Sequence, residues 1–212
     1  MVKNQKGVSL VELIAAIPLT VLVFVILTMA VSSFVTTYKE TRLYLQLQDE
    51  LYNMVDLIRH GYIDEDIEAS EGLIGLMTAN KVEISGGRNI MTLRPVIIAE
   101  GLPDAYKTTF YADSDGRLLV SGQYGLNSFQ ETQIFPSSNM RIGRELQFRL
   151  IDQDVFTVTK RTTHGPIMVK LHFKGQVRFR EKELGQNPLE DKKLNTRIVE
   201  YNTSVFVGNT KG

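Results

Sequence analysis

The sequence predicts an α+β fold in which one long N-terminal helix packs on an antiparallel β-sheet head. An apolar run near the N-terminus continues into a stripe of apolar residues at helical spacing. After that stripe, short runs with strand periodicity alternate with turn residues. We therefore expect three segments: a leader peptide at residues 1–7, a long helix at 8–59 whose half at about 8–35 is apolar, and a β-rich head at 60–212.

The apolar run extends from Val8 to Val35, and Glu12 is its only charged residue. As a helix, this run measures about 40 Å at about 1.5 Å per residue, whereas a bilayer's hydrocarbon core is roughly 30 Å thick. It is also longer than the apolar part of a secretory signal, about 7–15 residues. We expect a single transmembrane helix. Lys3 and Lys6 precede it, which favours a cytoplasmic N-terminus and an external head.

Glu12 is an ionisable group inside this apolar run, so it is a candidate functional residue. One interpretation is local: Ser9 and Glu12 have the spacing of a helix capping box, and a carboxylate near a helix N-terminus is favoured by the helix dipole. The other is that Glu12 pairs with a positive group of a neighbouring molecule, because a buried carboxylate needs such a partner. The two interpretations are compatible.

The string KGVSLVELIAA, residues 6–16, resembles the type IV prepilin signature. The resemblance implies that a prepilin peptidase of the inner membrane cuts after Gly7 and methylates the new N-terminal amine of Val8. Glu12 is then the fifth residue of the mature chain, where the family has a glutamate that can meet a neighbouring subunit's N-terminal amine. Subunits would then add in register, because a wrong register would leave a charge unpaired.

Two features depart from that family. Its mature chains usually begin with phenylalanine or methionine, whereas this one would begin with Val8. Pro18 lies earlier than the helix proline of many major pilins. A proline inside a helix removes one backbone hydrogen bond and clashes with the preceding turn, so we expect a kink or a locally melted turn around Ile14 to Pro18.

Beyond the apolar run, apolar residues recur at steps of three and four among charged and amide side chains: Tyr44, Leu47, Leu51, Met54 and Ile58. This stripe predicts an amphipathic helical half that packs on the head. The helix is expected to stop at His60-Gly61, with Gly61 as the C-terminal cap residue. Tyr62 to Gly75 is acidic and is expected to be irregular or a short helix.

The head shows runs at strand spacing: Lys81–Ser85, Ile90–Ile98, Thr108–Tyr111, Arg117–Ser121, Glu145–Ile151, Val155–Lys160, Ile167–Phe173 and Arg197–Val207. Hairpin turns are expected at Gly86-Gly87, at Asp113 to Gly116 and at Asp152 to Asp154. Glu181 to Asn195 is predicted to be a long surface loop. The expected hairpin from Leu146–Leu150 into Val155–Val158 and the closing strand Val199–Val207 are similar to those of the larger minor pilins and minor pseudopilins.

The composition and the motifs argue against several other functions. Lysine plus arginine equals aspartate plus glutamate, 24 each, so we expect no nucleic-acid partner. Cysteine is absent, which excludes thiolate metal sites and cysteine nucleophiles. The three histidines, His60, His164 and His172, lack zinc-site spacing. We therefore expect no catalytic residues, no metal, no cofactor and no small-molecule substrate, and we do not interpret the protein as an enzyme.

Two local features have a functional and a structural interpretation. Asp113-Ser114-Asp115-Gly116 could be a calcium-binding turn, but it lacks the later glutamate of an EF-hand, and a plain turn is favoured. Whether the head binds calcium stays open.

A basic run that could contact DNA consists of Lys170, Lys174, Arg178, Arg180 and Lys182. Glu181 and Glu183 interrupt it, which favours a solvated strand face.

The resemblance implies a structural subunit of a type IV pilus or type II secretion-like filament, a minor pilin or pseudopilin acting in initiation or at the tip. Its partners would be the prepilin peptidase, other pilins or pseudopilins and the bacterial inner membrane, with the head in the periplasm and, after assembly, in a filament or at the cell surface. The alternative is a single-pass anchored periplasmic binding module that never assembles.

Processing distinguishes these two interpretations. If the signature is used, the mature protein begins at N-methylated Val8, and mass spectrometry of the N-terminal peptide will detect that species. Replacing Gly7 by a bulky residue should leave the uncleaved, membrane-anchored precursor. An intact Met1 in membranes that contain an active prepilin peptidase would contradict the prediction.

Overall fold

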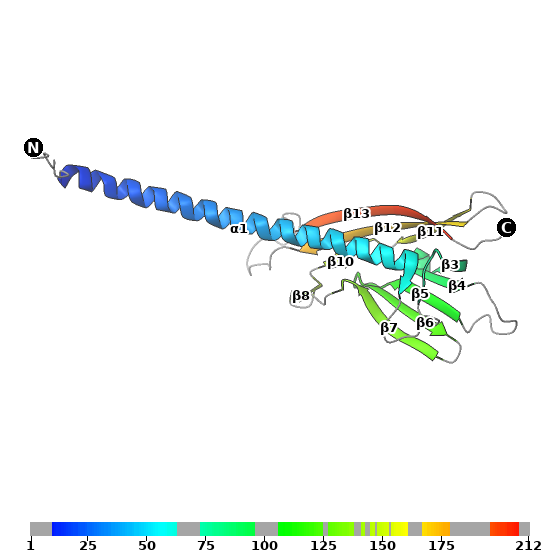
Figure 1. Cartoon of the computed structure of the whole chain (residues 1–212). Helices are drawn as coiled ribbons and strands as arrows, with labels where there is room; N and C mark the ends of the chain where they lie inside the picture. Colours follow the sequence, from blue (N-terminus) through cyan, green and yellow to red (C-terminus); the bar gives the residue numbers. More distant parts are fainter. Residues whose placement is uncertain are drawn as a thin grey trace, which may run out of the picture. The chain divides into compact units, whose positions relative to one another are not determined.

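The computed structural model describes residues 10–62, 73–95, 106–124, 127–137, 141–142, 145–146, 148–152, 154–160, 167–178 and 196–207. The chain forms two compact units, Met1–Arg42 and Leu43–Gly212. Helix α1 (Leu10–His60) belongs to both, because its first part lies in one unit and its last part in the other (Figure 1). The predicted α+β class is confirmed: a long N-terminal helix packs on antiparallel sheets.

Helix α1 is continuous through Ile14 to Pro18, so the expectation of a melted turn there was wrong. Proline removes only one donor from the hydrogen-bond ladder, and strong helix formers stand near Pro18 on both sides, Ala15 and Ala16 before it and Leu19 after it. The predicted start at Val8 lies outside the described residues. The predicted end at Arg59 agrees to within one residue with the observed end at His60.

Gly61 ends α1 as predicted. Its φ of 92° is a backbone conformation that favours glycine, and a Cβ there would collide with the carbonyl oxygen of Leu73. The last carbonyls of the helix are satisfied by the chain that returns beside them. The backbone N–H groups of Leu76 and Met77 donate to the carbonyls of Ile58 and Arg59, at 2.9 and 3.0 Å.

The first large sheet is an antiparallel meander in which each strand pairs with the next along the chain. Its strands are β3 (Ala79–Ser85), β4 (Ile90–Pro95), β5 (Tyr106–Ala112), β6 (Leu118–Tyr124) and β7 (Asn127–Phe135). The turn after β3, η1 (Gly86–Arg88), and the turn after β5 lie where the sequence predicts them. Strand β7 was not predicted. It is an edge strand, its polar residues at 130–132 are exposed, and its register against β6 is irregular. Its sequence therefore shows no alternation of apolar and polar residues from which a strand could be predicted.

The second large sheet is built around β12 (Ile167–Arg178). Strand β13 (Thr196–Phe206) pairs with one edge of β12 along its whole length. Strands β10 (Phe148–Leu150) and β11 (Phe156–Lys160) share the other edge, β10 opposite residues 175–177 and β11 opposite 167–171.

The predicted hairpin from Leu146–Leu150 into Val155–Val158 is therefore wrong, because β10 and β11 do not pair with each other. The polar residues taken for its turn form a bulge in one interrupted strand. Ile151 N–H donates to the Lys174 carbonyl at 2.9 Å, and His172 N–H donates to the Val155 carbonyl at 3.0 Å. Between these two hydrogen bonds the segment leaves regular pairing, and it continues beyond them on the same edge of β12.

Two small strand pairs complete the described structure: β1 (Gly61–Tyr62) with β2 (Leu73–Ile74), and β8 (Arg141–Ile142) with β9 (Glu145–Leu146). Strand β9 belongs to the run predicted at Glu145–Ile151. Other expectations lie outside the described residues: the end of the run at Ile90–Ile98 beyond Pro95, most of the acidic segment after Tyr62, and the loop Glu181 to Asn195.

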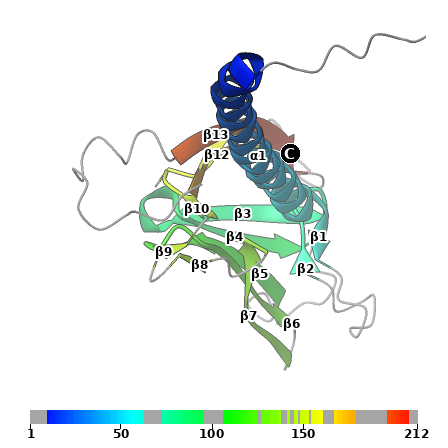
Figure 2. The ribbon, with the colours of Figure 1, turned by 90° about the vertical axis from the view of Figure 1, so that its left-hand side faces the viewer.

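A single hydrophobic core joins the head half of α1 to both large sheets. Leu47, Leu51, Met54, Val55 and Ile58 contribute from the helix, and four of these belong to the predicted stripe. In Figure 2, strands β12 and β13 of the second sheet are drawn beside the helix, and the strands of the first sheet lie below them. Gly175 of β12 leaves space for Leu47 and Leu51, since a Cβ there would lie 3.0 and 2.9 Å from their methyl groups. Phe156 and Phe173 meet edge to face, with ring centroids 6.1 Å apart.

Two leucines of α1 provide a matched test of this packing. Leu51 is fully buried, whereas Leu45 is 52% exposed. Leu51→Ala should lower the unfolding free energy by about 2–5 kcal/mol, because it leaves a cavity between helix and sheet. Leu45→Ala should change it by less than about 1 kcal/mol. Urea unfolding of the full chain in detergent measures both, and equal losses would contradict the described packing.

Candidate functional site: the exposed face of the long helix

Of the sequence-predicted site residues, Lys3, Lys6, Gly7 and Val8 lie outside the described residues. Glu12 is described: it is exposed and occupies the first turn of α1 as its acidic residue. A carboxylate in that position is favoured by the helix dipole. Ser9, the other member of the expected capping box, lies outside the described residues, so both the local interpretation of Glu12 and its pairing with a neighbour stay predictions.

The first part of α1 presents apolar side chains on all sides. From Leu10 to Val35 its large apolar residues are between 42% and 75% exposed. Its threonine hydroxyls are satisfied by their own helix: Thr20 Oγ1 donates to the Ala16 carbonyl and Thr28 Oγ1 to the Phe24 carbonyl, both at 2.8 Å. Within the described residues, α1 is the one helix long and apolar enough to cross a membrane. It is compatible with a single-pass membrane anchor.

An exposed apolar stripe with a strict seven-residue repeat runs along α1. It consists of Leu10, Ile17, Phe24, Val31, Tyr38, Leu45 and Tyr52, each between 52% and 75% exposed. We call it the heptad stripe. Its last two members lie in the Leu43–Gly212 unit, on the part of the helix that packs on the head.

The heptad stripe and the core contacts lie on different sides of α1. At about 100° per residue, Leu45 is roughly opposite Leu47, and Tyr52 is roughly opposite Met54. Leu47 and Met54 are buried in the core, whereas Tyr52 is 59% exposed. On a straight helix, residues seven apart shift around the axis by about 20° per heptad. If the helix winds around a partner helix in a left-handed sense, these residues all stay in contact with the partner. The stripe supplies one of the two apolar positions per heptad that a coiled-coil surface has; in the head half the residues three positions on, Thr41 and Gln48, are polar.

Tyr38, Leu45 and Tyr52 were not predicted as site residues, although their seven-residue spacing is present in the sequence. In the membrane-length segment almost every residue is apolar, so no single stripe stands out. In the amphipathic half, the stripe that was recognised is the one that enters the core. The second stripe becomes distinct only when burial separates the two faces.

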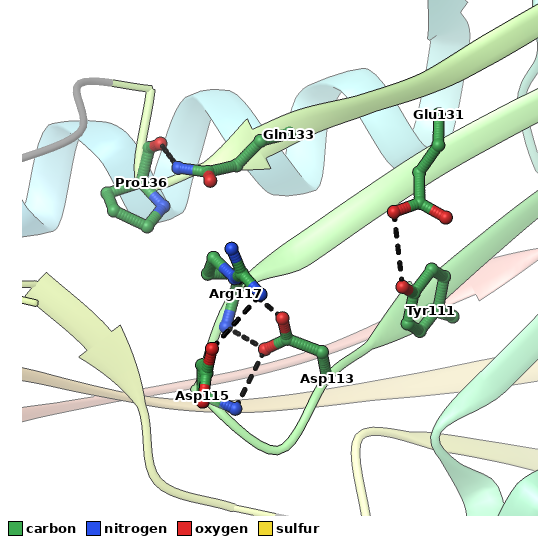
Figure 3. Close-up of polar contacts among 7 residues, drawn as sticks. All are labelled: Tyr111, Asp113, Asp115, Arg117, Glu131, Gln133 and Pro136. Atoms are coloured by element: carbon green, nitrogen blue, oxygen red, sulfur yellow. Dashed lines mark hydrogen bonds and ion pairs between the residues drawn. The ribbon is translucent and has the colours of Figure 1, made fainter.

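Among the other sequence candidates, the turn after β5 is a closed polar network (Figure 3). Asp113 Oδ1 accepts hydrogen bonds from the backbone N–H of Asp115 and Arg117, and Asp113 Oδ2 lies 2.6 Å from Arg117 Nε. Asp115 Oδ2 accepts from Arg117 Nη2 at 3.0 Å. The hydrogen bond with Asp113 raises the pKa of Arg117. The guanidinium thus supplies the positive charge that a calcium ion would bring, in agreement with a plain turn.

This turn also joins the two large sheets, because the backbone N–H of Leu150 in β10 donates to the Gly116 carbonyl at 2.7 Å. Beside it, the Tyr111 hydroxyl donates to Glu131 at 3.2 Å, and burial followed by the Glu131 charge raises the pKa of Tyr111. The side-chain amide of Gln133 donates to the Pro136 carbonyl at 2.6 Å (Figure 3). These contacts are structural and hold the end of the meander.

The described histidines lie in different places. His60 is 3.4 Å from Asp56 one helical turn earlier, and His172 lies between Asp152 and Glu200, at 3.3 and 3.2 Å. His164, Arg180 and Lys182 fall outside the described residues. Lys170, Lys174 and Arg178 of the basic run lie on the face of β12 that points away from the core. Within the described part of the chain, no group of three or more histidine or carboxylate side chains has the arrangement of a metal site.

Comparison of the chain with protein-family models, with characterised proteins and with solved structures finds no match.

The turn network can be tested with two aspartates that both contact Arg117. Asp113 is only 12% exposed and accepts three hydrogen bonds, so Asp113→Ala should lower the unfolding free energy by about 1–3 kcal/mol. Asp115 is 65% exposed, and Asp115→Ala should cost less than about 1 kcal/mol. Chemical denaturation of both variants provides the comparison; an equally small loss in both would mean that the network does not stabilise the fold.

Proposed function

We propose that this chain is a minor pilin or minor pseudopilin: a non-catalytic subunit of a type IV pilus or type II secretion-like filament, acting in initiation or at the tip. It is inserted in the bacterial inner membrane with its N-terminus in the cytoplasm and its head in the periplasm. A prepilin peptidase cuts after Gly7 and methylates Val8. Its other partners are pilins or pseudopilins, and it acts without a cofactor.

Two features of the N-terminal region support this proposal. The first is the joint pattern of Lys3, Lys6, Gly7, Val8 and Glu12 at the start of an apolar run. The second is the continuous helix that carries this run into the head without a break at Pro18. A continuous helix allows the membrane segment to leave the bilayer without exposing unpaired backbone groups, since its backbone hydrogen bonds are made within the helix.

The observation that carries the proposal is the exposure of Leu45 and Tyr52 on the head half of α1. A membrane anchor needs only about 20 apolar residues. Leu45 lies well beyond that length when counted from Leu10, and it belongs to a face that the head leaves uncovered. An apolar stripe that continues past the membrane-length segment suits packing against helices of neighbouring subunits.

The alternative, an anchored periplasmic binding module, also has a single-pass helix and a folded head. It gives no role to Glu12 beyond helix capping and none to the exposed Leu45 and Tyr52. The two functions therefore predict different results when these positions are changed.

The double variant Leu45→Ala/Tyr52→Ala should insert into the membrane, be cleaved after Gly7 and fold, because both side chains lie outside the core. Its co-purification with partner pilins should fall about tenfold or more, since burying a leucine-sized side chain contributes about 1.5–3 kcal/mol. Glu12→Gln should likewise preserve insertion and cleavage but lower incorporation, because it retains the size and removes the charge. Immunoblots of purified filaments and membranes in the native host measure each step.

Urea unfolding of Leu45→Ala distinguishes a defect in assembly from a defect in folding. This variant should unfold at nearly the wild-type urea concentration. Normal filament number and normal partner co-purification in both variants would refute the assembly role. Crosslinking from position 45 or 52 to a partner's N-terminal helix provides a direct measurement. If no crosslink to any pilin forms, the anchored periplasmic binding module is favoured.

A further inference from the structure

The outer face of the second sheet carries an open cavity of about 540 Å³, lined by both polar and apolar atoms. Its floor comes from neighbouring strands. The odd-numbered residues from Val169 to Val177 on β12 are buried, so the even-numbered ones point outward. Pairing of the strands places Thr157 of β11, Lys170 of β12 and Ser204 of β13 in one row. His172 and Asn202 form the next row.

One wall of the cavity comes from Arg88 and Asp154. Arg88 lies in the turn between β3 and β4 and has a φ of 73°, in the left-handed region that residues other than glycine seldom adopt. Such backbone conformations concentrate at ligand-binding sites. Asp154 belongs to the bulge between β10 and β11, and its Oδ2 lies 3.8 Å from Arg88 Nη1. The bulge and the turn thus bring a cation and a carboxylate to the same edge of the floor.

The floor itself is held in place by contacts outside the cavity wall. His172 Nε2 lies 3.3 Å from Asp152 Oδ2 and 3.2 Å from Glu200 Oε1. The Asn202 side-chain amide donates to Glu200 Oε1 at 3.1 Å. The hydrogen bond between Asn202 and Glu200 restrains the second row of the floor, whereas His172 Nε2 lies near the two carboxylates without forming a hydrogen bond in the described structure. Lys170 differs, because no carboxylate of the described residues forms an ion pair with it.

The cavity therefore offers two positive groups, Arg88 and Lys170, beside the hydroxyls of Thr157 and Ser204 and one carboxylate, Asp154. Positive groups with several N–H donors suit a carboxylate ligand. Hydroxyl side chains and the Asp154 carboxylate suit ligand hydroxyls, since they can accept the hydrogen bonds that those hydroxyls donate. A bare inorganic anion would use the positive groups and could accept from the Thr157 and Ser204 hydroxyls, but it would bring no sugar hydroxyls to donate to the Asp154 carboxylate.

We propose that this cavity binds a saccharide unit that carries a carboxylate, of the uronic acid kind. Lys170 and Arg88 contact the carboxylate, and Thr157, Ser204 and Asp154 contact the sugar hydroxyls. The site is for binding only and involves no reaction, so it goes beyond the proposed filament role and beyond our expectation of no small-molecule substrate.

The test uses the full chain in detergent micelles, titrated with sodium D-glucuronate and followed by saturation-transfer NMR and calorimetry. D-Glucose serves as the neutral sugar and inorganic phosphate as the sugar-free anion. We expect saturable binding of glucuronate that is at least about tenfold tighter than that of either control. D-Glucose lacks the charge-assisted hydrogen bonds to Lys170 and Arg88, and phosphate lacks the sugar hydroxyls that donate to Asp154. The measurement requires neither cleavage nor a filament, so its outcome is independent of the proposed function.

Lys170→Gln should weaken glucuronate binding about tenfold, while Lys174→Gln should change it less than about twofold. Lys174 is the matched control because it lies on the same face of β12, outside the cavity lining, 4.0 Å from Asp152. Equal weakening by both variants, equal binding of glucose or phosphate, or no saturable binding of glucuronate would overturn the proposal. Denaturation curves of both variants confirm that any loss comes from the site and not from unfolding.

Discussion

The head is organised by the burial of one face of α1 between two sheets. Leu47 and Leu51 lie over Gly175 of β12, and the same core includes Phe110 of the meander. Neither large sheet is more than five strands wide, and each exposes an outer face with polar residues. Each inner face therefore needs the helix, or the other sheet, to exclude water from its apolar side chains. The chain has no cysteine, so this packing holds the head together without disulfides.

This use of one helix face leaves the opposite face exposed. A helix that served only to cover a sheet would be expected to carry polar residues on its outer side. Here the outer side carries exposed polar residues such as Gln48, Asp49 and Asp56, and also Leu45 and Tyr52, which continue a seven-residue repeat of the membrane-length segment. The two faces thus differ in function. The inner face stabilises the head, and we propose that the outer face packs against the helix of a neighbouring subunit.

Strand β12 is the second organising element. Its 12 residues are long enough to pair with β13 on one edge and with β10 and β11, one after the other, on the second edge. The bulge that joins β10 to β11 moves Asp152 toward His172 and Asp154 toward Arg88. The polar outer face and its cavity are therefore consequences of how the strands share β12. They have no counterpart in a local sequence motif.

Local patterns determined the main features of the chain. The apolar run, the three- and four-residue spacing of Leu47, Leu51 and Ile58, and Gly61 at the helix end depend on side chains close together in sequence, so they could be predicted. The turn at Asp113 to Gly116 could be predicted for the same reason. The edge strand β7 lacks an apolar alternation, and the bulge at 151–155 resembles a hairpin turn because both contain aspartates. Which strand lies beside β12, which side of α1 stays exposed, and which charges meet around His172 depend on contacts between residues far apart in the sequence. Only the tertiary structure decides these, because burial and strand pairing are properties of the assembled core.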